Sequence, residues 1–322
     1  MNDYINNFLK GNVFSEKDIL KILGENNING KILNINYSFF KKVYIKIENE
    51  KKVNHLKLCL DNYSISLAKN EAKGYLLLNK FYENKFNLID YKMIAENNNY
   101  ALAKMKFING KKSSYFEFKN FYNYNYLNNL NTIPLKAYIN KIKDKYNFDS
   151  IVNLKNELFE QSLNNFIIRS ENVEIPIDVS HGDFIHYNTF KDAHKNYVFD
   201  LEFFQADRSF LYDYFHWYLT PIFTNSITLR KNFNLFSSIY PIIFKLLNFN
   251  LMNNIHNYKN IFENNNLFNL LLILFLFEKS MILTRVLNLK NLNELIDENQ
   301  KNLTKKHISI ICNTLIKLTK KI

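Results

Sequence analysis

The stretch SHGDFIHYNTFKDAHKNYVFDLEFF, residues 180–204, decides the fold because it places acidic and amide side chains beside short apolar runs. Asp183 and Asn188 lie five residues apart in a predicted loop, and Asp200 follows the apolar run YVF. A loop between two short strands can turn all three side chains toward one point. An aspartate there could accept a proton from an attacking hydroxyl. Amide and carboxylate oxygens are hard ligands that suit Mg²⁺ bound to phosphate oxygens.

The composition indicates a folded protein of one large or two smaller domains. The chain has 322 residues, of which 47% are hydrophobic and 16% aromatic, enough for well-filled cores. Its formal net charge of +12 would fit a polyanionic partner if the basic residues were clustered. They are spread along the chain without a run of five. Nucleic acid is therefore not an expected partner, although an anionic small molecule is compatible with this charge.

The cysteines and the apolar segments favour a cytoplasmic protein. Cys59 and Cys312 form no metal-ligand spacing and no disulfide framework, which fits a reducing compartment. The N-terminal residues lack the apolar core of a signal peptide. The most apolar segment, 267–277, is interrupted by Asn269 and is shorter than the roughly 20 residues that span a bilayer. We expect a buried helix there and no membrane span, while the oligomeric state is not predicted.

Apolar periodicity divides the chain near residue 110. Before this point, it predicts helices and strands in the order helix 3–23, three strands within 30–60, a helix capped by Ser64 or Ser66, and two strands ending at Gly110. After this point, the predicted elements are mostly helices, at 133–146, 150–169, 209–222, 227–248, 258–285 and 303–320. Short strands flank the loop around Asp183. The expected class is α+β, with a small five-stranded lobe and a larger helical lobe.

Two motifs resemble those of the aminoglycoside phosphotransferase and choline kinase family, within the protein-kinase-like fold. They are HGDFIHYN at 181–188 and VFDLE at 198–202. The resemblance implies a two-lobed fold with a five-stranded antiparallel N-lobe, residues 1–110, that binds the nucleotide. The mostly helical C-lobe, residues 111–322, would carry catalysis and bind the acceptor. ATP or GTP would be the co-substrate and Mg²⁺ the cofactor.

The resemblance also implies roles for the residues of the first motif and for Asp200. Asp183 matches the catalytic aspartate, and Asn188 and Asp200 match the metal ligands. His181 and Gly182 would support the site. A tight catalytic turn brings the backbone close to the phosphoryl group, where a Cβ atom at position 182 would be unwelcome.

Further matches occur in the family's order along the chain. Lys57 lies on the third predicted strand, where the family has its phosphate-binding lysine, although Lys46 also lies on a strand. Glu71 opens the next helix and matches the ion-pair partner of that lysine. The stretch AKMKFING resembles the hinge that holds adenine, with the backbone of Lys106 and Phe107 as the expected contacts.

Two acidic residues of the larger lobe match supporting positions, and one family feature is missing. Glu202 matches the glutamate of the Asp-x-Glu motif, and Asp213 matches the aspartate that braces the catalytic loop from the following helix. The six glycines of the chain form no Gly-x-Gly-x-x-Gly loop. The turn NYSFFKK, residues 36–42, would have to cover the phosphates with the backbone of other residues.

Two other functions fit parts of the sequence. His181, Asp183 and His186 could be ligands of a transition metal in a hydrolase, but this interpretation leaves Lys57 and Glu71 unused. A non-catalytic nucleotide-binding module of the same fold is the other alternative. It is weakened because all the motif's polar residues are present.

The expected reaction moves the γ-phosphoryl group of ATP or GTP to a hydroxyl of a small molecule. Asp213 follows Asp200 by only thirteen positions, too few for an activation segment that docks a peptide. Similarity to phosphotransferases encoded with surface-polysaccharide genes favours a sugar or sugar-like alcohol as acceptor. Choline or ethanolamine comes next, and then an aminoglycoside.

Overall fold

The chain forms two compact units. Unit 1 contains residues 1–122 and 186–204, and unit 2 contains residues 123–185 and 205–322. The computed structural model describes the following residues of these units: 15–38, 42–50, 52–81, 86–106, 110–114, 117–118, 130–146, 157–169, 172–193, 195–228, 265–288 and 298–319.

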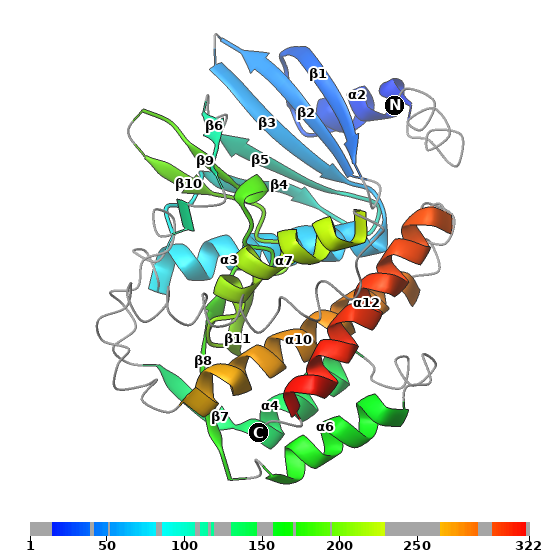
Figure 1. The fold of residues 1–322 in the computed structure, drawn as a ribbon. Helices are drawn as coiled ribbons and strands as arrows, with labels where there is room; N and C mark the ends of the chain where they lie inside the picture. Colours follow the sequence, from blue (N-terminus) through cyan, green and yellow to red (C-terminus); the bar gives the residue numbers. More distant parts are fainter. Residues whose placement is uncertain are drawn as a thin grey trace. The chain divides into compact units, whose positions relative to one another are not determined.

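Unit 1 is built on a five-stranded sheet (Figure 1). Its strands are β1 (Lys31–Ser38), β2 (Lys42–Asn49), β3 (Lys52–Cys59), β4 (Tyr91–Glu96) and β5 (Ala101–Lys106). They lie in the order β1-β2-β3-β5-β4, and every neighbouring pair is antiparallel. This confirms the predicted α+β class with a five-stranded antiparallel sheet.

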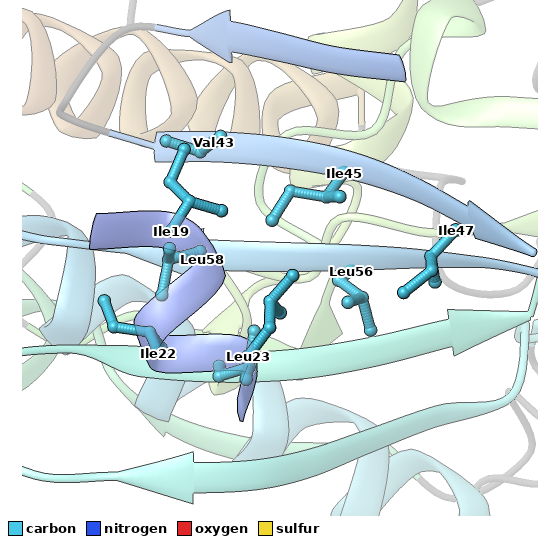
Figure 2. Close-up of a cluster of buried hydrophobic side chains, with 9 residues drawn as sticks. Ile19, Ile22, Leu23, Val43, Ile45, Ile47, Leu56 and Leu58 are labelled. Carbon is cyan, nitrogen blue, oxygen red and sulfur yellow. The ribbon is translucent and has the colours of Figure 1, made fainter. Parts of the chain in front are cut away.

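One face of this sheet is covered by α2 (Glu16–Glu25), as Figure 2 shows. Alternate residues of β2 and β3 point to this face because strand side chains alternate. Ile19, Ile22 and Leu23 of the helix pack on Val43, Ile45, Ile47, Leu56 and Leu58 of these strands. Ser15 and Asp18 form a capping box at the start of the helix. The first part of the predicted helix 3–23 lies outside the described residues.

The helix α3 (Asn62–Phe81) packs against β3, β4 and β5. It begins before the predicted serine caps, because Asp61 is the capping residue. The amide of Ser64 donates to Asp61 Oδ1 at 2.7 Å, and the amide of Asp61 donates to Ser64 Oγ at 3.2 Å. Ser64 is therefore the reciprocal partner of the cap rather than the cap.

A second, three-stranded sheet explains why residues 186–204 belong to unit 1. It has the order β10-β9-β6, with β6 (Lys111–Lys112), β9 (Thr189–Lys191) and β10 (Asn196–Val198). Val198 also forms a parallel bridge with Leu88. The predicted division at residue 110 did not anticipate this pairing. The functional part of that prediction, a nucleotide-binding lobe over 1–110 and a catalytic lobe over 111–322, stays a prediction.

Unit 2 combines a small sheet with helices. The sheet has the order β11-β8-β7, with β7 (Asn131–Pro134), β8 (Glu174–Ser180) and β11 (Gln205–Ser209). The described helices are α4 (Leu135–Tyr146), α6 (Glu157–Arg169), α7 (Tyr212–Thr228), α10 (Asn265–Asn288) and α12 (Glu298–Thr319). The helices predicted at 133–146 and 209–222 begin slightly later, because strands occupy their first residues. The predicted helix 227–248 lies almost wholly outside the described residues.

The core of unit 2 surrounds α10, which packs against α4, α7 and α12. Its segment Leu267–Thr284 is the one described helix long and apolar enough to cross a membrane, and 72% of that segment is buried inside the protein. Leu272, at its centre, is fully buried. The burial agrees with the predicted core helix.

The same helix places one carboxylate in a buried group that we call the Arg208 cluster, made of Arg208, Glu278, Tyr138 and Tyr146. Arg208 Nε donates to Glu278 Oε1 at 3.0 Å. The hydroxyls of Tyr138 and Tyr146 donate to the same carboxylate at 2.9 and 3.3 Å. The charge of Glu278 is therefore compensated and hydrogen-bonded within the core of unit 2.

Candidate active site

Lys57 lies at the centre of the acidic side chains of unit 1. Leu56 and Leu58 point toward α2, so Lys57 points to the opposite face of the sheet. Its Nζ lies 2.7 Å from Glu71 Oε2, 2.8 Å from Asp200 Oδ1 and 2.5 Å from Glu202 Oε1. The lysine side chain is only 2% exposed, so these carboxylates replace its water.

The helix α3 positions residues 200–204, the segment that carries Asp200 and Glu202 and ends unit 1. Asn70 Nδ2 donates to the backbone carbonyls of Glu202 and Phe204 at 2.8 and 3.0 Å. One turn later, Gly74 allows close approach, since a Cβ atom there would lie 2.8 Å from the Phe204 ring. Glu71 lies between these two positions, so a single helix holds both the segment and a carboxylate that binds Lys57.

Asp200 has an unusual backbone conformation. Its φ is +67°, in the left-handed region where aspartate is tolerated better than most residues. Its carboxylate is 25% exposed, compared with 0% for Glu71 and 4% for Glu202. Among these three carboxylates, that of Asp200 is the most accessible to a bound group.

A second lysine, Lys42, joins this group and was missed by sequence reasoning. Its Nζ lies 2.6 and 2.5 Å from the two carboxylate oxygens of Glu202, and the residue is buried. The signal was the hairpin register: Lys42 pairs with Cys59, and thus lies on the same face as Lys57. Lys46 lies on the same face and pairs with His55 in this register. We call Lys42, Lys57, Glu71, Asp200 and Glu202 the lysine–carboxylate cluster.

The charges in this cluster are not evenly matched, since three carboxylates face two ammonium groups. Burial alone would lower the pKa of Lys57, but Glu71, Asp200 and Glu202 together hold it well above its usual value. Burial raises the pKa of Glu71 to about 7, although the charge of Lys57 opposes this shift. Lys57 is therefore cationic, and the cluster has three acidic side chains for two lysines.

Asp213, in the first turn of α7, holds the loop that follows β8 in unit 2. Asp213 Oδ1 accepts from Ser180 Oγ at 2.8 Å and from the Gly182 amide at 2.9 Å, and Oδ2 accepts from the His181 amide at 2.8 Å. Gly182 has φ +84°, which glycine adopts without steric cost. The glycine is thus explained by the backbone turn itself.

Asp183 follows this braced turn, and its carboxylate is 33% exposed. Its amide donates to His181 Nδ1 at 3.3 Å. Asp183 Oδ1 lies 3.4 Å from His216 Nε2, which in turn lies 2.7 Å from Lys279 Nζ. Sequence reasoning missed both His216 and Lys279. The one available signal was that His216 follows Asp213 by three residues, on the same face of a helix.

The remaining predicted residues lie in unit 1 or outside the described part of the chain. Asn188 is buried in a short 3-10 helix, His186–Asn188, and its backbone carbonyl accepts from the Phe199 amide at 3.2 Å. This bond ties Asn188 to the residue before Asp200. Lys106 ends β5, and its amide donates to the Asp90 carbonyl at 3.0 Å. Phe107 lies outside the described residues.

No protein-family model and no curated protein matches the sequence. A thermostable mutant of aminoglycoside phosphotransferase APH(4)-Ia, in ternary complex with AMP-PNP and hygromycin B, matches with a TM-score of 0.55 at 10% identity, over 93% of this chain and 98% of that chain. A candidate aminoglycoside phosphotransferase from Ralstonia eutropha JMP134 matches with a TM-score of 0.54 at 11% identity, over 96% and 99%.

The chain has the aminoglycoside phosphotransferase fold. The microcompartment-associated aminopropanol kinase also matches, with a TM-score of 0.51 at 9% identity, over 93% of this chain and 95% of that chain. The predicted resemblance is thus confirmed at the level of the fold. The order of motifs along the chain is what carried that prediction.

The three carboxylates around Lys57 also lie close enough to one another for one of them, the accessible Asp200, to contact a hard cation as well. Glu71, Asp200 and Glu202 each place a carboxylate oxygen within 4.8 Å of the others. Carboxylate oxygens and one accessible member, Asp200, fit Mg²⁺ better than a transition metal. His181, by contrast, uses Nδ1 to accept a hydrogen bond from its own loop. The hydrolase alternative therefore has less support than the phosphotransferase interpretation.

Proposed function

We propose that this protein is a kinase that moves the γ-phosphoryl group of ATP or GTP to a hydroxyl of a small molecule. The observation that carries the proposal is the buried contact of Lys57 with both Glu71 and Asp200. A buried lysine needs a compensating carboxylate, but it does not need three. A cation held by a helix glutamate and shared with a more accessible aspartate is suited to binding phosphate oxygens.

The candidate site residues of unit 1 each have a role in binding the nucleotide. Lys57 contacts the phosphates, and Glu71 keeps the lysine cationic and oriented. The backbone of Lys106 and Phe107 holds the adenine or guanine base. Asp200 and Asn188 would hold Mg²⁺, which when bound offsets the negative charge of the phosphates.

Asp183 acts on the acceptor. Its carboxylate takes the proton of the acceptor hydroxyl while the hydroxyl oxygen forms a bond to the γ-phosphorus. The bond from that phosphorus to the bridging oxygen breaks, and its electron pair leaves with the nucleoside diphosphate. Asp213 and Gly182 fix the turn that carries Asp183, and positioning of this kind supplies much of the rate of phosphoryl transfer.

A sugar or sugar-like alcohol, as in surface-polysaccharide metabolism, is the first acceptor to test. Choline, ethanolamine and aminoglycosides follow. The relatives differ in this respect, since one binds hygromycin B and another is an aminopropanol kinase. We further propose that the protein acts in the cytoplasm, because its two cysteines are both free and buried.

The test combines a binding and a transfer measurement on the full chain. AMP-PNP with Mg²⁺ should raise the melting temperature, because a ligand of the folded state stabilises it by mass action. Phosphorus NMR of ATP or GTP incubated with each acceptor should then show a phosphate ester only with the true acceptor. Asp183→Asn should keep the thermal shift and lower turnover by about 10²–10⁴-fold.

Two outcomes would replace the proposal. A thermal shift without any phosphate ester, across all acceptors, would favour the non-catalytic nucleotide-binding module. A tightly bound transition metal whose loss on His186→Ala abolishes activity, while Asp183→Asn remains active, would favour the hydrolase.

A further inference from the structure

Three side chains from three elements of unit 2 form a short polar row that no sequence motif marks. Lys279 of α10 places Nζ 2.7 Å from His216 Nε2, and His216 of α7 places this nitrogen 3.4 Å from Asp183 Oδ1. Asp183 itself lies in the loop after β8. The row therefore begins in the core helix and ends at the partly exposed carboxylate that we propose as the base.

The surroundings fix the imidazole ring in place. His216 is fully buried, between the ring of Tyr212 at a centroid distance of 6.0 Å and that of Phe275 at 6.4 Å. Lys279 is also buried. An ammonium group in such surroundings is costly unless a negative charge compensates it.

Among the charged groups around this row, Asp183 is the one that compensates the positive charge of Lys279. Glu278 is adjacent to Lys279 in sequence, but it is hydrogen-bonded to Arg208 within the Arg208 cluster. Arg208 and His181 are the other basic groups that act on the row, and Arg208 opposes a charge on Lys279. Asp183 is the strongest of the groups that favour the charged lysine.

We propose that His216 and Lys279 are positioning residues for phosphoryl transfer, which hold the Asp183 carboxylate in place and supply a buried positive charge behind it. This inference rests on the proposed function of Asp183. The charge attracts the Asp183 carboxylate and holds it beside the buried end of the row. The neutral imidazole accepts from the ammonium at Nε2 and so fixes the position of the charge, while the attraction between Lys279 and the Asp183 carboxylate acts through space.

The ionisation of the two residues agrees with this arrangement. Burial and the charge of Lys279 hold the pKa of His216 well below its usual value, so the ring is neutral. Burial lowers the pKa of Lys279 to about 8, although Asp183 opposes the shift. As the pH rises through about 8, Lys279 loses its proton and the carboxylate loses its counter-charge. Turnover should therefore decline on the alkaline side of pH 8.

The experiment measures kcat and KM against pH for the full-length wild type, Lys279→Met, Lys279→Arg and His216→Gln. Ser280→Ala is the matched control, because Ser280 is buried beside Lys279 in the same helix and its hydroxyl donates to the helix carbonyl of Phe277. Lys279→Met should lower kcat by about 10-fold, less than loss of the base itself. It should leave the KM for nucleotide unchanged and remove the alkaline decline. Lys279→Arg should restore part of kcat without the alkaline decline.

A second readout does not depend on activity. Nitrogen-15 NMR of the imidazole rings, with the His216 signal identified by its loss in His216→Gln, should show a ring that stays neutral well below pH 6.5. Lys279→Met should raise the pH at which His216 gains its proton, and Asp183→Asn should shift the same signal. These NMR results test the contacts among Lys279, His216 and Asp183 independently of activity. Failure to phosphorylate any acceptor would refute only the proposed function.

The inference is overturned if phosphoryl transfer occurs but Lys279→Met behaves like Ser280→Ala in kcat and in the pH profile. It is equally overturned if the pH dependence of the His216 signal is unchanged in both Lys279→Met and Asp183→Asn. If Lys279→Met does not fold, the kinetics of His216→Gln and the His216 signal in Asp183→Asn replace it. The inference is then overturned if His216→Gln behaves like Ser280→Ala or if the signal does not change.

Discussion

The two buried charge clusters of this protein differ in how completely their charges are matched. In the Arg208 cluster, one guanidinium and two phenols surround one carboxylate, and Arg208 and Glu278 are 1% and 0% exposed. In the lysine–carboxylate cluster, three carboxylates share two lysines, and Glu71 Oε1 has no hydrogen-bond partner among the described residues. A closed, balanced cluster supports the core. An open cluster with surplus acceptors supports binding.

The sharpest way to break this comparison is Asp200→Asn, which removes the accessible carboxylate and keeps its shape. We expect kcat to fall by more than about 100-fold. The Mg²⁺-dependent part of the nucleotide thermal shift should fall to near zero. The free energy of unfolding should change by less than about 1 kcal/mol, because Lys57 keeps Glu71 and Glu202. Asp90→Asn, at an 85% exposed side chain, is the control. A loss of several kcal/mol would make this cluster structural.

The opposite result is expected from Arg208→Met. Removing the guanidinium leaves Glu278 buried without a compensating charge, which costs about 3–5 kcal/mol of unfolding free energy. Urea denaturation measures this loss. Adding Glu278→Gln should recover much of it, because the amide needs no counter-ion. A loss below about 1 kcal/mol for the single variant would mean that the two clusters do not differ in kind.

The packing under the open cluster can be tested with a pair of glycines. Gly74→Ala should lower the free energy of unfolding by about 1–3 kcal/mol, because its Cβ would meet Phe204 at 2.8 Å. It should also lower turnover by displacing the segment that carries Asp200. Gly24→Ala, in α2 with nothing within 4 Å, should raise stability by up to about 1 kcal/mol. Thermal unfolding of both variants checks this contrast, and equal behaviour would refute it.

The smallest expected effect belongs to Lys42→Met. Lys42 contacts Glu202, and Lys57 is the lysine that we propose for the phosphates, so loss of Lys42 should lower kcat by only about 10-fold, as for other residues that orient a neighbouring site residue. Lys46→Met, on the same strand and face, should change kcat by less than twofold. Steady-state kinetics distinguish the two. A larger loss for Lys46→Met would move the phosphate-binding role away from Lys57.

The residues that the sequence could predict are those that belong to a recognisable motif or to an expected order of elements. Lys57, Glu71, Asp200 and Asp213 were predicted from their order on successive elements, and the geometry around them now gives each a partner. The pairing of Lys42 with Glu202 joins residues 160 positions apart. No periodicity carries that information, because it depends on how the hairpin register meets the segment after β10.

His216 and Lys279 were missed for a related reason. Each is a polar residue in an apolar helix, where the simplest expectation is a satisfied core position. Their relation to Asp183 depends on the packing of α7 against α10, which the sequence pattern does not specify. The fold class was easier, because alternation in five strands and the helical period each repeat over many residues.

Adjacent residues of α10 serve two different partners, and this has a consequence for how the chain can change. Glu278 and Lys279 point about 100° apart around the helix axis, one toward Arg208 and the other toward His216. Only one rotational setting of the helix satisfies both. Insertion of a single residue between Phe268 and Phe277 would turn the following residues by about 100° and break both contacts together, although the composition of the helix would hardly change. Natural variants of this chain should therefore tolerate substitution within α10 far more readily than any change in its length.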